Sequence, residues 1–533
     1  MSTYTITTPV ADLPFELKQT FAGEFVFVKN AYIAYLLDNT GFNQITDTDY
    51  PSYHSYAVTS ITRSGSVATV TTTTTNTLEV GNTVVIAGAV ETEYNGTFTV
   101  ASIVTPGSVF TYAVTGTPST PATGTITANG GWTTVPGIVY LDDYIFVGRV
   151  DGEIQNSDRA DFTVWDPLSF FTPDKEPSLL VRIAKSLNFL VAFKTWDTQF
   201  YYNGEVAPPG SPMLEQESAY LKLGCAAAYS VVEFDGGIVF VSQRDQLQRS
   251  REVHVLNGLT PKKISTPNVE RILNASTLED IKSLYLSTAG HQLYVLTMPD
   301  VELTLVYDFN NGFWYQWTYL TAQSAQSVIS LTSDGTIATA SVLDHGFEDG
   351  DPVLIAGASP DDYNGTFNVT IVDDNTFTYT VPDTTSPATG TITATGYDES
   401  YFPAVAYATY QNLDLVLHET NGIIYALDTD TFSDTDVPIN VLLRLAPWDN
   451  GNKYRKTFSH IRAVGDLTDS TVLIRHSDDD YETWSTYRAQ SMASQYSMLR
   501  KLGQGRRRAW EMRHTADTAG RWEALDQDFR QGF

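Results

Sequence analysis

The chain has 533 residues, enough for several domains, and its composition favours strands, because aromatic residues make up 12% and charged residues only 18%. A single cysteine excludes a disulfide framework and a cysteine-based metal site, and agrees with folding in a reducing cytosol. The N-terminus lacks the basic and apolar regions of a signal peptide, and no apolar run approaches the roughly 18 residues of a membrane span, so we expect neither secretion nor membrane insertion.

The negative charge is concentrated in the first 450 residues. This part holds 18 Lys and Arg against 51 Asp and Glu, whereas residues 451–533 hold 14 against 11. Affinity for phosphate comes from Lys and Arg side chains that release counterions, so the acidic body is a poor candidate for tight binding of nucleic acid. It suits a surface past which DNA moves without adhering.

A short β-unit recurs along the chain. In residues 283–317, apolar residues alternate with a period of two and Asn311-Gly312 marks a tight turn, which predicts a small antiparallel meander. Similar units begin near Phe21, Ile138, Ile183, Val231, Ser283 and Pro403. Two consecutive spacings, of 45 and 48 residues, match the roughly 40–50 residues of propeller repeats. The units therefore predict an all-β protein built on a propeller of roughly six blades.

Two long gaps between these units hold the same inserted sequence. One copy contains VGNTVVIAGAVETEYNGTFTV and the other DGDPVLIAGASPDDYNGTFNV, and both continue into FTY and PATGTITA. The aligned pairs are Gly81 with Gly350, Tyr94 with Tyr363, Asn95 with Asn364, Phe98 with Phe367, Phe110 with Phe377 and Ile126 with Ile392. Short Thr/Val-rich strands without helical periodicity predict two homologous small β-domains, each a sandwich or barrel that projects from the propeller rim.

These patterns give a complete domain prediction. Propeller segments are expected at 1–56, 130–325 and 396–430, the inserted modules at 57–129 and 326–395, and a C-terminal β-sandwich of five or six strands at 431–533. The sandwich is expected to begin with a strand at Val437–Trp448. Residues 271–282 form the only stretch for which we predict a helix.

The segment HSDDDYETWS resembles the Asp-box hairpin of sialidase propellers. Ser477, Asp479, Thr483 and Trp484 fit that pattern, whereas Tyr481 replaces its glycine. The aspartate of such a hairpin accepts hydrogen bonds from nearby backbone N–H groups, and the tryptophan packs under the turn. We therefore interpret these residues as a structural turn without a catalytic role.

No pattern selects a catalytic, metal or cofactor site. A glycosidase needs two carboxylates about 5–10 Å apart, one with a raised pKa, and no local motif distinguishes such a pair. Arg149, Arg159 and Arg182 are the arginines available for an anionic sugar, but their contexts do not repeat. The eight histidines lack zinc-site spacing, His254 and His418 are expected inside strands, and there is no phosphate-binding glycine loop.

Two further motifs have simple structural interpretations. Asn95-Gly96-Thr97 and Asn364-Gly365-Thr366 match the glycosylation pattern, but we predict that each Asn-Gly pair forms a type I′ turn in its module. The run Arg506, Arg507 and Arg508 is a candidate contact with phosphate or with the acidic body of a neighbouring subunit. The alternative for this run is a solvated loop.

Taken together, the motifs from Ile183 to Trp317 resemble the tail hub, or nozzle, proteins of short-tailed bacteriophages, also called packaged-DNA stabilisation proteins. The resemblance rests on LKLGCAAAYSVVEFDGGIVFVSQ, VHVLNGLTPKKISTPNVERIL and LVYDFNNGFWYQW, followed in the expected order by SDDDYETWS and GRRRAWEMR. It covers about half of the chain. The two inserted modules depart from a minimal member and are similar to small β-domains that decorate many phage virion proteins.

The resemblance implies a structural virion protein without cofactors. It implies a hexameric ring, assembled in the host cytoplasm below the head-to-tail adaptor, that extends and closes the DNA channel and holds tail fibres or spikes. DNA would pass without specific binding, in agreement with the acidic body. The alternatives are a propeller glycosidase or carbohydrate-binding receptor protein of the virion, and a bacterial surface protein, which the missing signal peptide disfavours.

Overall fold

The computed structural model describes residues 15–20, 25–39, 41–207, 209–235, 237–244, 250–278, 280–382, 384–411, 413–428, 430–434 and 437–532. The N-terminal segment, which lacks a predicted secretory signal, and Phe21, at the start of the first predicted unit, lie outside the described residues. Nearly all described elements are strands. The described part of the chain contains no helix with the length and hydropathy of a transmembrane span.

The helix α1 begins and ends earlier than the sequence pattern suggested. It spans Pro267–Ala275 instead of residues 271–282. Thr266 caps its N-terminus by accepting a hydrogen bond from the N–H of Val269, and Pro267 occupies the first turn, where a missing N–H costs nothing. The predicted range 271–282 overlaps α1 only at residues 271–275, because it overlooked this Thr-Pro start signal and continued past the C-cap Ser276.

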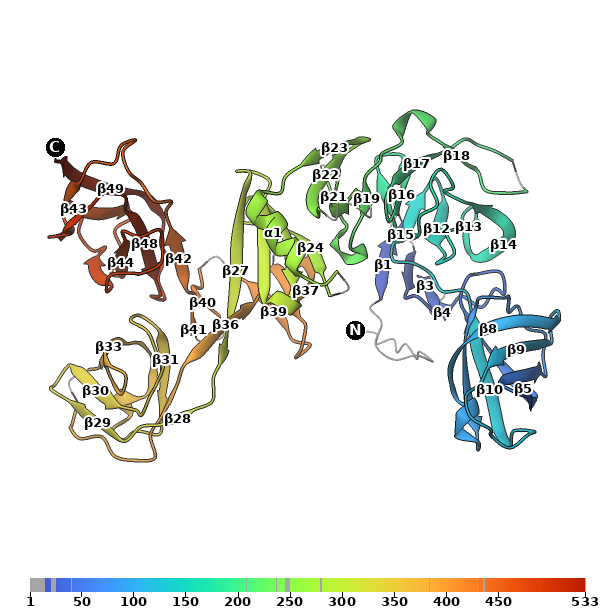
Figure 1. Ribbon diagram of the computed structural model, residues 1–533, viewed down its shortest axis with the longest axis horizontal. Coiled ribbons are helices and arrows are strands. Elements are labelled where there is room, and N and C mark those ends of the chain that lie inside the picture. The colour runs from blue at the N-terminus through green and yellow to red at the C-terminus, as the bar shows by residue number, and fades with distance from the viewer. Residues whose placement is uncertain are drawn as a thin grey trace. The chain divides into compact units, whose positions relative to one another are not determined.

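Six antiparallel sheets occur in the order of the six predicted units (Figure 1). The first sheet is β1 (Glu16–Gln19), β2 (Val26–Lys29), β3 (Ala34–Asp38) and β4 (Gly41–Gln44). The second is β11 (Val139–Leu141), β12 (Tyr144–Gly148), β13 (Ile154–Asp158) and β14 (Asp161–Phe171). The third is β15 (Leu180–Ser186), β16 (Phe189–Lys194), β17 (Thr198–Asn203) and β18 (Met213–Glu215).

The later sheets are less regular. The fourth is β19 (Gly224–Cys225), β21 (Gly237–Gln243), β22 (Glu252–Asn257) and β23 (Thr260–Lys263), with β20 (Val232–Phe234) paired to β21. The fifth is β24 (Lys282–Thr288), β25 (His291–Met298), β26 (Leu303–Asp308), β27 (Phe313–Ala322) and β36 (Tyr397–Tyr401). The sixth is β37 (Ala404–Tyr410), β38 (Leu413–His418) and β39 (Ile424–Leu427).

The first four sheets pack consecutively on one another through apolar side chains. One core joins Phe27 of the first sheet to Ile145 and Val147 of the second, and another joins Phe193 of the third to Phe240 of the fourth. A middle strand of such a stack is covered on both faces, so it is a continuous apolar run without two-residue alternation. This explains the buried segments YIFVG, FLVAF and GIVFV in β12, β16 and β21.

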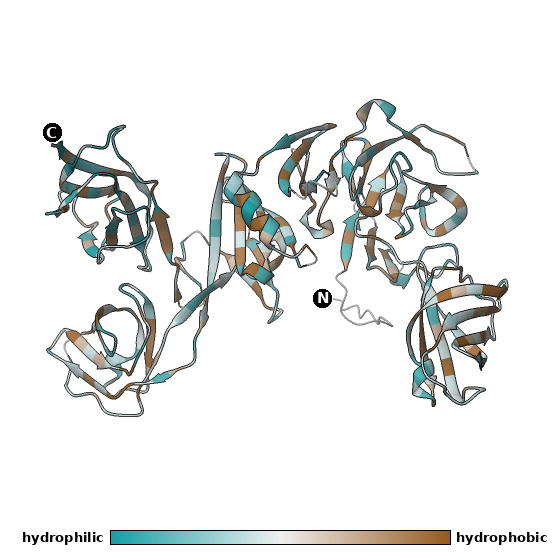
Figure 2. Ribbon diagram, in the orientation of Figure 1, coloured by the Kyte–Doolittle hydropathy of each residue, from teal (hydrophilic) through white to brown (hydrophobic). Residues whose placement is uncertain are grey.

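The first inserted module is a closed barrel. Its strand order is β10-β5-β6-β9-β8-β7, and the ring closes because β10 pairs with both β5 and β7. The strands are β5 (Tyr53–Ser64), β6 (Val67–Thr72), β7 (Thr83–Ala89), β8 (Gly96–Thr105), β9 (Val109–Ala113) and β10 (Gly124–Gly131). Hydrophobic and more polar residues alternate along these strands (Figure 2), as expected when one face fills a core and the other meets water.

The second module has the corresponding strands in two four-stranded sheets. One sheet is β28 (Gln326–Ser327), β35 (Thr393–Thr395), β31 (Pro352–Ala356) and β32 (Gly365–Asn368). The other is β29 (Ser330–Ser333), β30 (Ile337–Ser341), β34 (Thr376–Thr380) and β33 (Thr370–Asp373). The aligned residues Phe110 and Phe377 are both fully buried in the module cores.

The repeated Asn-Gly pairs do not form type I′ turns, and that prediction was wrong. Asn95 has φ −84° and Asn364 has φ −86°, whereas a type I′ turn needs positive φ at both central residues. Each asparagine follows a short 3₁₀ turn. Asn95 donates to the carbonyl of Ala89 and accepts from its N–H, at 2.7 and 2.9 Å, and Asn364 does the same with Ala358 at 2.8 and 2.9 Å. The side chain therefore replaces a backbone pairing partner.

The C-terminal part forms two four-stranded sheets with one core. One is β42 (Val441–Arg444), β48 (Ala509–His514), β44 (Thr471–Ser477) and β45 (Arg488–Ser491). In the other, β43 (Lys456–Gly465) pairs with β46 (Leu499–Arg500), β47 (Gln504–Gly505) and β49 (Trp522–Gln531). The single strand predicted at Val437–Trp448 is instead broken into β41 (Val437–Pro438), which pairs with β40 (Ser433–Asp434), and β42.

The chain forms two compact units. The first comprises Met1–Leu286, Gln292–Val301 and Tyr307–Phe313, and the second comprises Ser287–His291, Glu302–Val306 and Trp314–Phe533. The first module belongs to the first unit, and the second module and the C-terminal sandwich belong to the second unit.

Candidate functional site

Segments from five consecutive sheets meet around one cavity in the first unit. Its volume is about 330 Å³, and its walls come from β1, β15, β20, β24 and the two residues that precede β11. Such convergence is the geometry of a propeller, in which the innermost strands of the blades surround a central axis. The charged side chains that line this axial cavity are Glu16, Lys18, Arg182 and Glu233.

Every one of these axial charges has a partner. Glu16 lies 2.9 Å from the Arg182 guanidinium and accepts the N–H of Gly137 at 2.6 Å, and Lys18 lies 2.7 Å from Glu233. Burial alone would raise the pKa of Glu16, but Arg182, Lys29 and the Gly137 N–H together lower it below its ordinary value. Glu16 is therefore a charged structural carboxylate at neutral pH.

Lys29 lies behind the cavity and is almost completely buried. Its ammonium group donates to the Val135 carbonyl at 2.9 Å and to the Thr134 hydroxyl at 3.2 Å, and it lies 3.7 Å from Glu16. Burial lowers the pKa of Lys29 to about 8, although the charge of Glu16 opposes this change. These contacts tie the first sheet to the segment that precedes the second.

The axial cavity does not provide the groups that glycoside hydrolysis needs. Both of its carboxylates are ion-paired, and a general acid needs a raised pKa at a carboxylate that is free to give up its proton. Arg149, Arg159 and Arg182 also line three different cavities, so they do not form a cluster for an anionic sugar.

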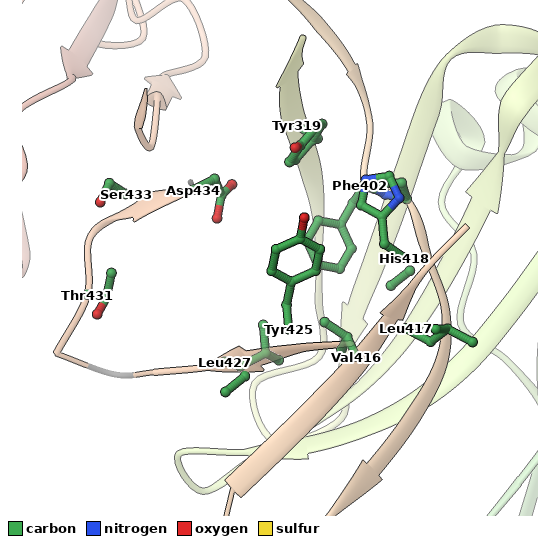
Figure 3. Close-up of a pocket in the computed structure, with 13 residues that line it drawn as sticks. Tyr319, Phe402, Val416, Leu417, His418, Tyr425, Leu427, Thr431, Ser433 and Asp434 are labelled. Carbon is green, nitrogen blue, oxygen red and sulfur yellow. The ribbon is translucent and has the colours of Figure 1, made fainter. Parts of the chain in front are cut away.

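An apolar cavity of about 240 Å³ lies in the second unit. Figure 3 shows Tyr319, Phe402, Tyr425 and His418 gathered on one side of it, with Asp434 on the opposite side. Burial raises the pKa of Asp434. Among the described residues that line this cavity, Asp434 is the one carboxylate, so a mechanism with two carboxylates is not available here either.

The Asp-box-like residues come together in one turn after β44. The carboxylate of Asp479 accepts hydrogen bonds from the Ser477 hydroxyl at 2.7 Å, from the Thr483 N–H at 2.9 Å and from the Thr483 hydroxyl. These bonds lower the pKa of Asp479 to about 2. Tyr481, which replaces the expected glycine, has φ +79°, and its hydroxyl donates to the Leu445 carbonyl at 3.2 Å.

Trp484 connects this turn to an ionic cluster around the buried Glu511, which the sequence pattern did not identify. Its ring lies under two guanidinium groups, 5.2 Å from Arg444 and 5.0 Å from Arg475. Both arginines pair with Glu511, which is fully buried and also accepts the Tyr487 hydroxyl at 2.6 Å. Burial acts to raise the pKa of Glu511, but these donors lower it overall.

The predicted contact role must be withdrawn for Arg508. Its side chain is 1% exposed, forms two 2.7 Å hydrogen bonds to Asp478, donates to the Leu502 carbonyl at 2.6 Å and lies over the rings of Phe458 and Trp510. A group enclosed in this way cannot meet a neighbouring subunit. Hydrophobicity patterns missed its burial because the partner lies 30 residues away in sequence.

Exposed basic residues do gather at a nearby edge of the sandwich. The buried ammonium group of Lys456 donates to the carbonyls of Asn452, Tyr454 and Arg506, which draws the loop before β43 and the turn after β47 together. Lys453, Arg455 and Arg506 are exposed on these two segments, and none forms an ion pair with another described residue. We call these three residues the basic edge. Arg507 is exposed but pairs with Asp480 at 2.9 Å.

The described residues contain no group of three or more His, Cys, Asp and Glu side chains arranged for a metal ion. His254 is buried in β22, where its Nδ1 lies 2.8 Å from the Ser242 hydroxyl and burial lowers its pKa. His418 ends β38 and is partly exposed. Cys225 is buried, and burial raises the pKa of its thiol to about 12, so it is not activated as a nucleophile.

A protein-family model described as "Bacteriophage P22 Gp10, beta-propeller" matches residues 35–330. The chain belongs to this family. Membership in the Gp10 propeller family confirms the fold class expected from the sequence: an all-β chain built on a propeller, with two inserted homologous β-domains and a C-terminal sandwich. It also identifies the chain as a phage structural protein.

Other comparisons add little to the Gp10 family match. The solved structures that resemble the chain include the designed Ika8 protein, with 11% identity, coverage of 77% of this chain and 94% of that chain, and a TM-score of 0.26. They also include the endosialidase of phage phi92, with 10% identity, coverage of 94% of this chain and 74% of that chain, and a TM-score of 0.17. These scores are too low to transfer any property. No curated protein matches the chain.

Proposed function

We propose that the chain is the tail hub, or nozzle, of a short-tailed phage. In this proposal six copies assemble in the host cytoplasm into a ring below the head-to-tail adaptor, where they extend and close the DNA channel of the virion and take part in DNA ejection. The observation that carries the proposal is the match to the Gp10 propeller family over residues 35–330.

The charge distribution supports a channel that DNA crosses without binding. Residues 1–450 carry a large excess of acidic residues, and the basic side chains in the axial cavity are paired with carboxylates. Each unpaired Lys or Arg on a channel wall would add affinity for phosphate and slow the passage of the duplex. Six acidic copies would repel DNA from the wall and leave it mobile.

The basic edge is the surface that we assign to assembly. Lys453, Arg455 and Arg506 are exposed and lack ion-pair partners among the described residues, whereas most of the acidic charge lies in the rest of the chain. In a ring, one subunit's basic edge can meet the acidic surface of its neighbour or of the adaptor. The two inserted modules supply exposed β-surfaces that we assign to the docking of fibres or spikes.

In this proposal the chain has a structural role and catalyses no reaction. The axial carboxylates are ion-paired and the apolar cavity of the second unit has one acid, which disfavours the alternative of a propeller glycosidase.

The decisive experiment measures the mass of the purified protein by light scattering, alone and with the portal–adaptor complex of the same phage. Six copies per complex would support the hub. A protein that does not bind the portal–adaptor complex but does bind bacterial polysaccharide would favour the receptor alternative. A triple variant, K453E/R455E/R506E, is expected to reduce assembly at least tenfold, whereas R521E is the matched control because Arg521 is exposed but already paired with Asp466 at 3.0 Å.

A further inference from the structure

The apolar cavity of the second unit combines aromatic rings with one carboxylate. It lies within the second unit alone, between the sixth sheet, β27 and β40. Its rings are Tyr319 of β27, Phe402 before β37, His418 of β38 and Tyr425 of β39. Asp434 of β40 lies on the opposite side of the cavity (Figure 3). Rings and carboxylate therefore line one space from different elements of the fold.

The aromatic side of the cavity is a cluster of rings set at steep angles to one another. The ring centroids of Tyr319 and His418 are 5.7 Å apart with 75° between the ring planes, and those of His418 and Tyr425 are 5.9 Å apart with 55°. These rings and that of Phe402 are partly exposed, so part of each ring surface is accessible. Among the described residues, no Lys or Arg side chain lies over any of them. Aromatic rings arranged in this way can present their electron-rich faces to one cation.

The carboxylate of Asp434 lacks a cationic partner within the described part of the chain. Burial alone raises its pKa, whereas a paired carboxylate would have a lowered pKa. The described lining holds no Lys or Arg. The Nδ1 of His418 accepts the N–H of Thr420 at 3.2 Å, so this nitrogen carries no proton and the ring adds no positive charge. The cavity therefore has one negative charge and nothing in its lining that neutralises it.

This charge and these walls select the class of ligand. Asp434 repels an anion, and the lining offers no basic group that would hold one. A metal ion would need several ligating side chains, whereas the cavity supplies a single carboxylate. A primary ammonium group carries three N–H donors and is strongly hydrated, but the rings offer faces instead of acceptors. A quaternary ammonium ion has no N–H group to satisfy, and its methyl groups are compatible with aromatic and aliphatic walls.

We propose that the apolar cavity binds a small quaternary ammonium ion, with the charged nitrogen between the aromatic rings and the carboxylate of Asp434. The quadrupoles of the rings attract the cation, and the carboxylate adds a charge–charge attraction that is stronger away from bulk water. The cavity volume of about 240 Å³ lies below the roughly 300–1,000 Å³ of sites for drug-sized ligands, which suits a ligand of few atoms. The proposal does not rest on the hub function, because assembly of a ring requires no ligand at this position.

The test measures binding of tetramethylammonium and choline to the full-length protein by saturation-transfer NMR. The efficiency of small ligands predicts a Kd in the millimolar range. Dimethylbutanol, in which carbon replaces the nitrogen of choline, keeps the shape and removes the charge, and we expect it to bind at least tenfold more weakly. Pivalate is the anionic comparison. Sedimentation with phosphatidylcholine vesicles distinguishes the source of the group: binding of vesicles identifies a lipid headgroup, binding of choline alone identifies a free cation, and either result supports the proposal.

Variants locate the binding. Asp434→Asn is expected to weaken binding of tetramethylammonium at least tenfold, because the charge is lost while the shape is kept. Tyr425→Leu repeats the test from a partly exposed ring and keeps an apolar side chain. Asp430→Asn is the matched control, since Asp430 is an exposed acid of the same connection that does not line the cavity. Absence of binding by both cations, equal binding of choline and dimethylbutanol, stronger binding of pivalate, or unchanged binding in both cavity variants would overturn the proposal.

Discussion

Replacing Arg508 with alanine tests whether the arginine run contributes to the core or to an interface. The variant leaves Asp478 without its bidentate partner, leaves the Leu502 carbonyl without its donor and opens space beside Phe458 and Trp510. Breaking a buried ion pair costs about 3–5 kcal/mol, but Asp478 is 37% exposed and water can replace part of the loss. We therefore expect a cost of about 3 kcal/mol in the stability of the sandwich.

Hydrogen–deuterium exchange of the full-length protein measures this effect locally. A loss of about 3 kcal/mol corresponds to roughly 100-fold faster exchange if β44 and β48 open together. Arg507→Ala is the matched control, since its exposed pair with Asp480 contributes at most about 1 kcal/mol. Arg508→Lys should lie between them, because lysine keeps the charge and loses the planar fork. Equal protection in the Arg508→Ala and Arg507→Ala variants would refute the assignment of Arg508 to the core.

Three further predictions concern other hydrogen-bonded or ion-paired groups. Asn95→Ala should lower the stability of the first module by about 1–3 kcal/mol, and Asn364→Ala should lower that of the second module by the same amount. Both effects are measured as faster hydrogen exchange, in β7 for the first module and in β31 for the second. An effect on only one module would contradict the shared role of the two asparagines. Glu511→Gln should destabilise the sandwich by about 3 kcal/mol, because two guanidinium groups lose their counter-charge, and unchanged exchange in β48 would contradict this. Because the folded-state pKa of Lys29 lies at about 8, below the ordinary lysine pKa of 10.5, the unfolded chain binds more protons between these two pH values. The free energy of unfolding should therefore gain a contribution that rises from pH 8 toward 10.5, and Lys29→Met should remove that rise in parallel denaturation curves.

Local sequence patterns predicted the sheets, because strands and tight turns are formed by residues that are close together in the sequence. The apolar run of β16 and the Asn311-Gly312 turn after β26 can be recognised within a few residues. The duplicated modules were visible because identical residues such as Tyr94 and Tyr363 recur at nearly constant offset. The backbone conformation at the Asn-Gly pairs was not predicted correctly. The sequence suggests a tight turn at Asn95-Gly96, but the Asn95 side chain instead forms hydrogen bonds with the backbone of Ala89.

The candidate sites depended on partners that no local pattern specifies. Arg508 resembles a surface charge until Asp478 is placed beside it, and Glu511 resembles an exposed strand residue until Arg444 and Arg475 are placed around it. The axial cavity needs four strands from separate sheets and the segment that precedes β11. A local sequence signal was available at the Asp-box-like turn, where Ser477 and Asp479 interact across two residues.

The ends of each module lie side by side. In the first module, Tyr53 at the start of β5 pairs with Gly131 at the end of β10, and in the second, Gln326 of β28 pairs with Ala394 of β35. Paired residues in antiparallel strands are only about 5 Å apart, so the flanking chain needs little more than a tight connection where the module is absent. Each module is thus a cassette that recombination can add, delete or exchange without rethreading its host, and a laboratory can use the same two positions to graft a different domain onto the particle.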